Sequence, residues 1–340
     1  MTGKEEIKKR TREIYNVLPK LDDHICGYST CGQFARAVAE GRAPCNGCIT
    51  GGPEVAAEVC RITGVDIPED KPRPKYPGTS TPSMVSPQRK GKGKKVAITG
   101  KGGSGKTMLT AILTRILANE KVPRILAIDA DSSVNLPYAL GVEIRETVSE
   151  IRQRLIEEPG AKAAVRDRHI RDVMAEAIEW GEGFDMLVMG RPEGPGCYCG
   201  INDLLRYGID SLSGEYDVVL IDCEAGPEQV NRRVVNGVDV LVIVTDASVR
   251  GIRVARSIME VVQRDASMKQ TRTGLVINRS KGDDTVIRES AAEWGLDILG
   301  SVPEDEMVTE YDSVGRPIVD LPDTSPSVAA VRTILDKLLE

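Results

Sequence analysis

The segment GKGGSGKT, at residues 100–107, constrains the fold of this 340-residue chain more than any other. It fits the pattern G-x-x-x-x-G-K-[S/T], follows the apolar stretch KVAIT and precedes MLTAILTRILANE, which has helical periodicity. A strand, a glycine-rich loop and a helix are therefore expected in that order. Because the N–H groups of such a loop and the positive end of the helix bind phosphate, the segment predicts an α/β nucleotide-binding domain.

Each position of this loop has an expected task. Lys106 neutralises oxygens of the β- and γ-phosphates of ATP, and Thr107 holds Mg²⁺. Glycines let the backbone curl around the phosphates. The other loop residues expected to contact the nucleotide are Gly100, Gly102, Gly103, Ser104 and Gly105.

Short segments rich in β-branched residues recur after the loop, separated by segments of helical periodicity. Aromatic residues make up only 4% of the chain, so the core must consist mostly of Val, Ile, Leu and Ala. Apolar strands that alternate with helices predict a mostly parallel sheet covered by helices on both faces. The expected strands are KVAITG, RILAIDA, DMLVMG, DVVLIDC, VLVIVTD, GLVIN and DILGSVP.

Composition divides the chain into three parts. Residues 1–65 are cysteine-rich and helical, with too few large apolar side chains for a strong core of their own. Residues 66–94 form a proline-rich, basic linker. Residues 95–340 form the nucleotide-binding domain.

Charge and hydropathy exclude several functions. The net charge of −6 is concentrated in the nucleotide-binding domain, which argues against a nucleic-acid partner. The chain has no apolar run of the ~18 residues needed to span a bilayer, and no secretory signal, so we expect a cytoplasmic protein without a membrane partner. In a reducing compartment, its clustered cysteines favour metal or redox chemistry over disulfides.

The lysine directly after the first loop glycine, Lys101, resembles the signature of the deviant P-loop ATPases, the class of MinD, ParA and the nitrogenase iron protein. The resemblance implies that Lys101 takes part in catalysis by reaching across a homodimer interface to the partner's nucleotide. The segment AIDADSSVN resembles the first switch of this class, with Asn135 near its end. It implies that Asp129 and Asp131 are the water-positioning and magnesium-linked carboxylates.

Three further segments resemble this class in the expected order. VVLIDCEAG resembles the Walker B strand and second switch, which implies that Asp222 holds a magnesium-bound water. GLVINR places Asn278 at the position that reads adenine, and SVPEDE places Val302 and Pro303 where the nucleotide pocket closes. The ordered set implies ATPase activity. Cys223, next to Asp222, is expected to be an ordinary core residue.

A cysteine pair in MGRPEGPGCYCG stands out in a chain with only eight cysteines. On extended backbone, Cys197 and Cys199 point to the same side, and a disulfide between them would be strained. A tetrahedral site needs four ligands, so one chain supplies half of it and a two-fold dimer completes it. Thiolates suit zinc, iron–sulfur clusters and nickel, so Zn²⁺ or Ni²⁺ is expected and the spacing does not choose between them.

The same segment, with DCEAG after it, closely resembles the CooC-type accessory ATPases of carbon monoxide dehydrogenase. The resemblance implies that the pair binds metal across the nucleotide-dependent dimer. It also implies that the client is a nickel/iron–sulfur enzyme such as carbon monoxide dehydrogenase.

Four cysteines near the N-terminus have the spacing C-x4-C-x13-C-x2-C. They resemble the four-iron domain of the Rnf complex B subunit and of corrinoid iron–sulfur proteins, whose pattern is C-x2-C-x4-C-x16-C. Cys26, Cys31 and Cys48 match its last three positions, and Asp23 stands at the first. A 4Fe-4S cluster is therefore expected, and its fourth ligand stays open between Cys45, Asp23 and an open iron site. Zinc and unliganded thiols are the alternatives.

These features favour an ATP-dependent dimeric metallochaperone. ATP-gated electron transfer, as in nitrogenase-like reductases, is the alternative, because the N-terminal cluster could feed electrons to a client. An iron–sulfur scaffold ATPase of the Mrp type is the second alternative. In that type the cysteine pair is C-x2-C and lies downstream of Walker B, whereas the pair Cys197 and Cys199 lies upstream of it. The sequence does not identify the client, or say whether the cluster is redox-active.

Overall fold

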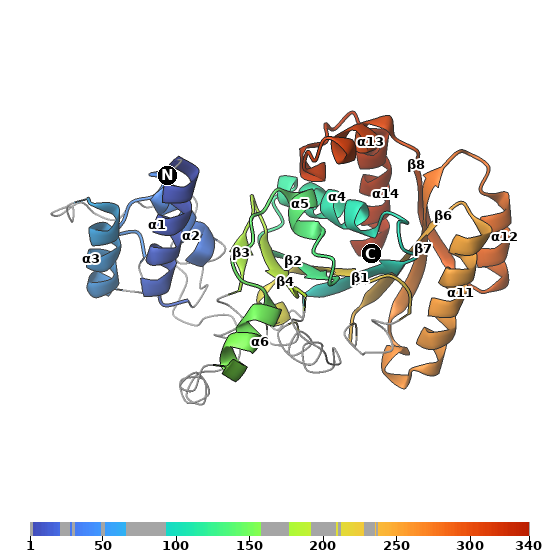
Figure 1. Ribbon diagram of the computed structural model, residues 1–340, viewed down its shortest axis with the longest axis horizontal. Coiled ribbons are helices and arrows are strands. Elements are labelled where there is room, and N and C mark those ends of the chain that lie inside the picture. The colour runs from blue at the N-terminus through green and yellow to red at the C-terminus, as the bar shows by residue number, and fades with distance from the viewer. Residues whose placement is uncertain are drawn as a thin grey trace, which may run out of the picture. The chain divides into compact units, whose positions relative to one another are not determined.

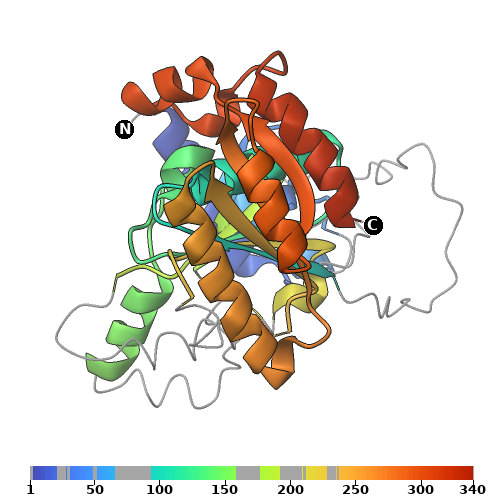
Figure 2. The ribbon, with the colours of Figure 1, turned by 90° about the vertical axis from the view of Figure 1, so that its right-hand side faces the viewer.

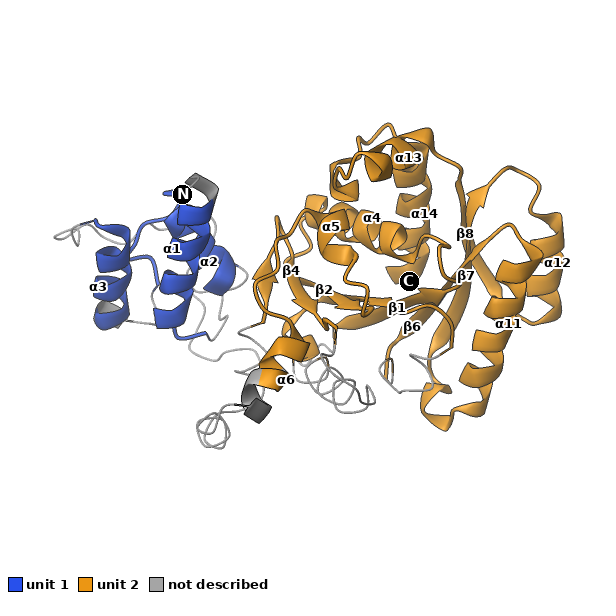
Figure 3. Ribbon diagram, viewed as in Figure 1, with its two compact units in different colours: residues 1–90 blue, residues 91–340 orange. Residues whose placement is uncertain are grey.

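The computed structural model describes residues 3–20, 28, 31–48, 52–65, 93–157, 177–191, 209, 212–227, 235 and 237–339. The chain divides into two compact units, residues 1–90 and 91–340 (Figure 3). Most of the predicted linker lies outside the described residues, and so do four predicted site residues. Those residues are Asp23, Cys26, Cys197 and Cys199.

Unit 2 is built on an eight-stranded sheet with the order β3-β4-β2-β5-β1-β6-β7-β8. All neighbouring strands are parallel except β3 and β4, which are antiparallel. The strands are β1 (Lys94–Gly100), β2 (Ile125–Ala130), β3 (Glu179–Trp180), β4 (Asp185–Val188), β5 (Val218–Cys223), β6 (Val240–Asp246), β7 (Arg272–Ser280) and β8 (Asp297–Pro303).

Helices cover both faces of this sheet (Figures 1 and 2). Side chains alternate along each strand, so that Val96 and Ile98 pack into the core beneath α4, α5 and α14, and Ala97 into the core beneath α6, α11 and α12. The helices are α4 (Lys106–Asn119), α5 (Leu136–Leu140), α6 (Val148–Glu157), α11 (Val249–Arg264), α12 (Thr285–Glu293), α13 (Glu306–Ser313) and α14 (Pro326–Leu339). Short 3₁₀ turns lie at η1 (Ser213–Glu215), η2 (Ala266–Met268) and η3 (Ile318–Asp320).

The predicted α/β architecture is confirmed. Every strand expected from the apolar segments forms, and the sheet is mostly parallel with helices on both faces. The edge strand β3 was not predicted, because two residues are too short to produce a periodic pattern. Among the described residues, no helix combines the length and apolarity needed to cross a membrane.

Unit 1 contains α1 (Gly3–Val17), α2 (Cys31–Ala39) and α3 (Gly52–Thr63). Its core is small and consists largely of alanine, cysteine and a few larger side chains, among them Ile14 and Phe34. The ring of Phe34 is 1% exposed and meets the edge of Tyr28, with 5.6 Å between the ring centroids. A disulfide joins Cys45, in the loop after α2, to Cys60 on α3.

Phe34→Ala tests how much unit 1 depends on this core. Deleting a buried Phe ring costs about 3–5 kcal/mol, which is comparable to the whole stability of so small a core. We expect unit 1 to unfold in the variant, while nucleotide binding by unit 2 is unchanged. Hydrogen exchange with mass spectrometry, alongside titration with a fluorescent ATP analogue, would measure both.

Phe34→Leu is the matched control, because it keeps much of the volume and should leave unit 1 folded. If residues 3–65 of Phe34→Ala kept native exchange protection, the core would not depend on this ring.

Candidate nucleotide-binding site

The register of the parallel strands brings the predicted site residues to one edge of the sheet. Asp129 at the end of β2 is the register partner of Asp222 on β5, and Gly100 at the end of β1 is the partner of Val244 on β6. Asp246, at the end of β6, is the partner of Asn278 on β7. Ligands of open α/β sheets bind at the carboxyl ends of strands, so this edge is the candidate site.

Two glycines of the loop are required by close approach of the chain to itself. Gly100 has a φ of 148°, and a Cβ there would lie 2.1 Å from the carbonyl oxygen of Val244. Gly105 has a φ of 95°, and a Cβ there would lie 2.1 Å from Nδ2 of Asn278. A side chain at position 100 would collide with the backbone of β6, one at position 105 would displace the amide of Asn278, and both φ values favour glycine.

The loop presents unsatisfied donors where phosphates are expected. Helix α4 begins after Gly105 with no side chain capping its first N–H groups. The ammonium of Lys106 is buried, and its hydrogen bond to the carbonyl oxygen of Lys101 is long, at 3.5 Å. Ser104 Oγ is buried and has no hydrogen-bond partner within the described structure. This arrangement fits a polyphosphate anion.

The residues expected to hold Mg²⁺ lie together. Thr107 Oγ1 donates a hydrogen bond of 2.6 Å to Oδ2 of Asp222. The other oxygen of Asp222 is buried and lacks a partner among the described residues. In the part of the chain that the structure describes, no group of three or more His, Cys, Asp or Glu side chains could bind a metal ion. The hydroxyl of Thr107 and the carboxylate of Asp222 are oxygen donors of the kind that Mg²⁺ takes from proteins, so this pair fits Mg²⁺ bound together with a nucleotide.

Asp129 is fully buried, and backbone N–H groups occupy both of its oxygens. Oδ1 accepts a hydrogen bond from the N–H of Asp131, and Oδ2 accepts one from the N–H of Leu136, each at 3.0 Å. In this structure Asp129 thus holds the segment that follows β2. Asp131 is more exposed and accepts a hydrogen bond from the N–H of Ser133. Their predicted roles in hydrolysis remain predictions.

Asp129 and Asp222, which are neighbours at this edge, have raised pKa values. Burial raises the pKa of Asp129 to about 8, and the neighbouring charge of Asp222 adds to the effect. Burial also raises the pKa of Asp222 to about 7, although the hydrogen bond from Thr107 and the charge of Lys106 oppose it. A buried pair of carboxyl groups near neutral pH needs a proton or a cation.

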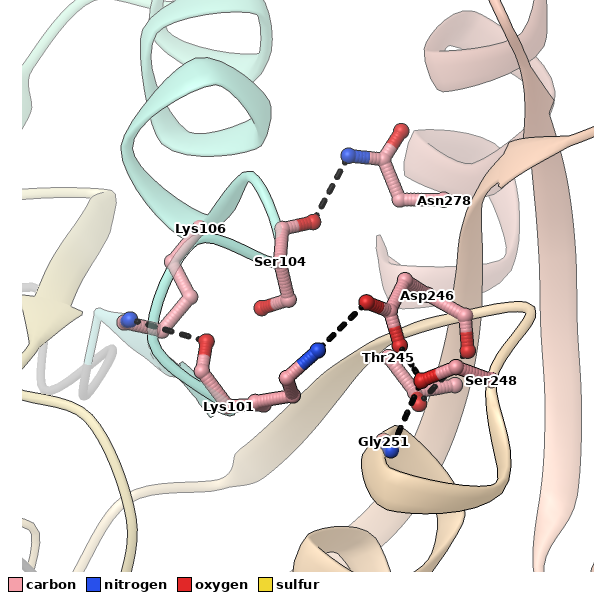
Figure 4. Close-up of polar contacts among 8 residues, drawn as sticks. All are labelled: Lys101, Ser104, Lys106, Thr245, Asp246, Ser248, Gly251 and Asn278. Atoms are coloured by element: carbon pink, nitrogen blue, oxygen red, sulfur yellow. Dashed lines mark hydrogen bonds and ion pairs between the residues drawn. The ribbon is translucent and has the colours of Figure 1, made fainter.

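Asn278 connects the loop to β7. Its Nδ2 donates a hydrogen bond of 2.7 Å to the carbonyl oxygen of Ser104, and its Oδ1 is buried without a partner in the described residues (Figure 4). Val302 is buried, and Pro303 ends β8, next to β7 in the sheet. Recognition of adenine by these residues stays a prediction. Oδ1 of Asn278 is suited to it as a hydrogen-bond acceptor without a partner in the described residues.

The segment DCEAG is tied to the phosphate loop. The N–H of Gly226 donates to the carbonyl oxygen of Gly100 at 2.9 Å, and Thr99 Oγ1 donates to the carbonyl oxygen of Gly226 at 3.2 Å. Cys223 is fully buried in the core, as expected, and burial raises the pKa of its thiol. Two hydrogen bonds therefore link Gly226 to the end of β1.

Lys101 has an acidic partner within its own chain. Its ammonium lies 2.6 Å from Oδ2 of Asp246 (Figure 4). Asp246 was not among the predicted site residues, although an acidic residue that ends the apolar strand VLVIVTD was a usable signal. The predicted contact of Lys101 with a partner subunit stays a prediction.

The described N-terminal cysteines lie in one buried core. Cys31 and Cys48, which occupy ligand positions of the predicted pattern, are buried thiols. Both suit an iron–sulfur cluster as soft donors. Cys45, another predicted ligand, is bonded to Cys60 and offers no thiolate in this form. As a ligand, Cys45 therefore requires prior reduction of that disulfide.

Comparisons with known families match both units. A model described as the CobQ/CobB/MinD/ParA nucleotide binding domain matches residues 95–318. A model for a proposed Fe-S cluster matches residues 18–50. The first match covers more than half of the chain.

Relatives and solved structures agree with the first match. The chain is 38% identical over 249 residues to an uncharacterized ATP-binding protein of Methanocaldococcus jannaschii, covering 72% of this chain and 98% of that one. It is 32% identical over 240 residues to the carbon monoxide dehydrogenase accessory protein CooC of Rhodospirillum rubrum, covering 67% of this chain and 90% of that one. The MinD cell division protein of Aquifex aeolicus superposes with a TM-score of 0.55 at 25% identity, covering 72% and 96% of the two chains.

Asp129→Asn tests the raised pKa of the buried carboxyl pair. Without nucleotide, Asp129 keeps its proton in the folded chain up to a pH of about 8 and loses it near pH 4 when unfolded. Stability is therefore lost as pH rises toward 8, by at most about 1.4 kcal/mol per pH unit for each such proton. We expect denaturant unfolding between pH 5.5 and 8 to show a shallower pH dependence in Asp129→Asn than in the wild type.

Histidine titration is common to both proteins, so the difference between the two slopes isolates the carboxyl group. Equal slopes would contradict a proton held at Asp129.

Proposed function

The chain belongs to the CobQ/CobB/MinD/ParA nucleotide-binding family and is an ATPase, and on that premise we propose that it is a dimeric metallochaperone. It delivers a metal ion to a nickel/iron–sulfur enzyme of the carbon monoxide dehydrogenase type. The observation that carries this proposal is the similarity to the accessory protein CooC over 90% of that protein's length. The cysteine pair at 197 and 199 supplies the metal-binding chemistry that such a role needs.

Nucleotide binding follows from the residues at the sheet edge. The loop N–H groups and Lys106 bind the phosphates, and Asn278 holds the loop through the carbonyl oxygen of Ser104. Thr107 and Asp222 would hold Mg²⁺, which would neutralise negative charge that develops on the phosphates. Water attacks the γ-phosphorus, the bond to the β-phosphate oxygen breaks, and ADP and inorganic phosphate leave.

The proposed cycle couples this reaction to metal. With ATP bound, Lys101 contacts the nucleotide of the partner subunit and two chains close face to face. Cys197 and Cys199 of both chains then form one four-thiolate site for Zn²⁺ or Ni²⁺, the cargo of the cycle. Hydrolysis resets the dimer. Metal passes to a client only if the two nucleotide states differ in their affinity for the metal or the client.

Replacing both cysteines of the pair by serine tests the shared site. With two ligands from each subunit, the metal content of the full chain should fall by one ion per two chains, because closure brings the ligands within the ~2.3 Å metal–sulfur distance. The loss should appear with a non-hydrolysable ATP analogue bound under reducing conditions. Metal analysis after gel filtration would measure it.

Lys106→Ala is the matched control for nucleotide dependence. It keeps both cysteines but should abolish analogue binding, and with it the extra half ion per chain. A loss of one ion per chain in the serine variant, or none, would defeat the shared site.

ATP-gated electron transfer is the second candidate, favoured by the Fe-S match over residues 18–50 and the buried thiols Cys31 and Cys48. A scaffold that passes on an iron–sulfur cluster, as in Mrp-type ATPases, would use the same thiols. In both cases the N-terminal cysteines, rather than the pair at 197 and 199, carry the activity.

Cys31→Ser separates these candidates from the metallochaperone. Loss of a thiolate ligand should remove the visible iron–sulfur absorbance of anaerobically reconstituted protein. For a metallochaperone, nickel-dependent activation of a client dehydrogenase should persist in this variant and fail in the Cys197/Cys199 double serine variant. The reverse pattern would support electron transfer or cluster donation. A wild-type chain that stays colourless after reconstitution would rule out the cluster.

A further inference from the structure

Strand register explains why Lys101 meets Asp246. Gly100 ends β1 opposite Val244 of the neighbouring β6, so the residue that follows β1, Lys101, lies beside the last residues of β6. The ammonium of Lys101 and the carboxylate of Asp246 form an ion pair of 2.6 Å, with side-chain exposures of 29% and 24%. Figure 4 shows the two side chains pointing toward each other, while Lys106 lies on the other side of Lys101.

Asp246 is also held by contacts that do not involve Lys101. Ser248 Oγ donates a hydrogen bond to Oδ1 of Asp246 and accepts one of 3.0 Å from the N–H of Gly251, in the first turn of α11. A Cβ at Gly251 would lie 2.3 Å from the same Oδ1 and 2.4 Å from Oγ1 of Thr245. The carboxylate is therefore held by the cap of α11, in a space that exists because residue 251 is glycine.

The backbone of Lys101 is held by the phosphate loop, whereas its side-chain ammonium has a single acidic partner among the described residues, which it can exchange for another anion. Its carbonyl oxygen accepts hydrogen bonds from the N–H of Ser104 and from Nζ of Lys106, so the main chain belongs to the phosphate loop. Its ammonium is partly exposed and bound to one carboxylate. Burial would raise the pKa of Asp246, but the hydrogen bonds from Lys101 and Ser248 outweigh it and hold the pKa below its ordinary value.

We propose that Asp246 is a positioning residue that holds Lys101 within its own chain and opposes ATP-dependent pairing of two chains. Lys101 must leave Asp246 to reach the phosphates of a partner's nucleotide, because the ammonium cannot contact both at full strength. A triphosphate carries several negative charges and Asp246 carries one, so Lys101 binds the nucleotide in preference to Asp246. The ion pair with Asp246 raises the concentration of nucleotide-bound partner that is needed to form the dimer. The inference rests on the proposed function, in which Lys101 acts across a dimer.

Asp246→Asn tests the exchange. Asparagine keeps the shape and can still accept the hydrogen bond from Ser248, but it removes the charge that competes for Lys101. Partly exposed ion pairs are weak, so we expect the dimer dissociation constant with a non-hydrolysable ATP analogue to fall about two- to fivefold. Analytical ultracentrifugation would measure it, and the gain should shrink at high salt.

The same change in a Lys101→Ala background is the decisive comparison. If Asp246 acts only through Lys101, adding Asp246→Asn to Lys101→Ala should change the dissociation constant no further. Glu260→Gln is the charge control, because Glu260 also lies in unit 2 but pairs with Arg256 on the surface of α11. Asp246→Ala serves as a second variant should the asparagine protein fail to fold.

Three results would overturn the proposal: pairing of Asp246→Asn that equals or falls below the wild type, a gain that survives in Lys101→Ala, or an equal gain in Glu260→Gln. If the wild type does not pair with the analogue, the dimeric part of the proposed function fails instead. The affinity of the single chain for a fluorescent ATP analogue then tests whether Asp246 competes with nucleotide for Lys101. A tightening in Asp246→Asn that Lys101→Ala removes supports competition for Lys101, and no change overturns it.

Discussion

The common alignment of the parallel strands at their carboxyl ends is the constraint on which the nucleotide site depends. It makes Asp129 the register partner of Asp222 and Asp246 the partner of Asn278, and it places the first loop glycine against β6. Because side chains alternate along a strand, a slip of one residue would turn each of these groups to the opposite face. The apolar residues between them fix the register by packing into two cores, so the same sequence pattern that builds the sheet also assembles the site.

Features encoded by neighbouring residues could be predicted from the sequence. The strands follow from runs of β-branched residues, and the phosphate loop follows from its glycines, lysine and threonine. Contacts between residues distant in the chain could not be predicted, because such contacts exist only once the sheet has formed. The pairs Lys101–Asp246 and Cys45–Cys60 are of this kind. The burial of Asp129 could not be predicted either. The position of this residue in the motif does not reveal that two backbone N–H groups donate to its carboxylate oxygens.

The two units are stabilised in different ways. Unit 2 buries a large aliphatic core on each face of its sheet, whereas the core of unit 1 holds four of the chain's eight cysteines. The disulfide between Cys45 and Cys60 closes a short loop, and such a link contributes about 3 kcal/mol by restricting the unfolded chain. Cys45 and Cys60 therefore contribute both to the packing of this small core and to its covalent cross-link, and replacing either one affects both.

The raised pKa of Asp222 links occupancy of the site to solution acidity. At a pKa of about 7, roughly half of these carboxyl groups carry a proton at neutral pH. In the proposed site Asp222 faces Mg²⁺ in its ionised form, so on that proposal binding of nucleotide with Mg²⁺ releases protons to the solution. The heat measured for this association will include the ionisation enthalpy of the buffer, and affinities determined in different buffers at one pH will agree while their enthalpies will not.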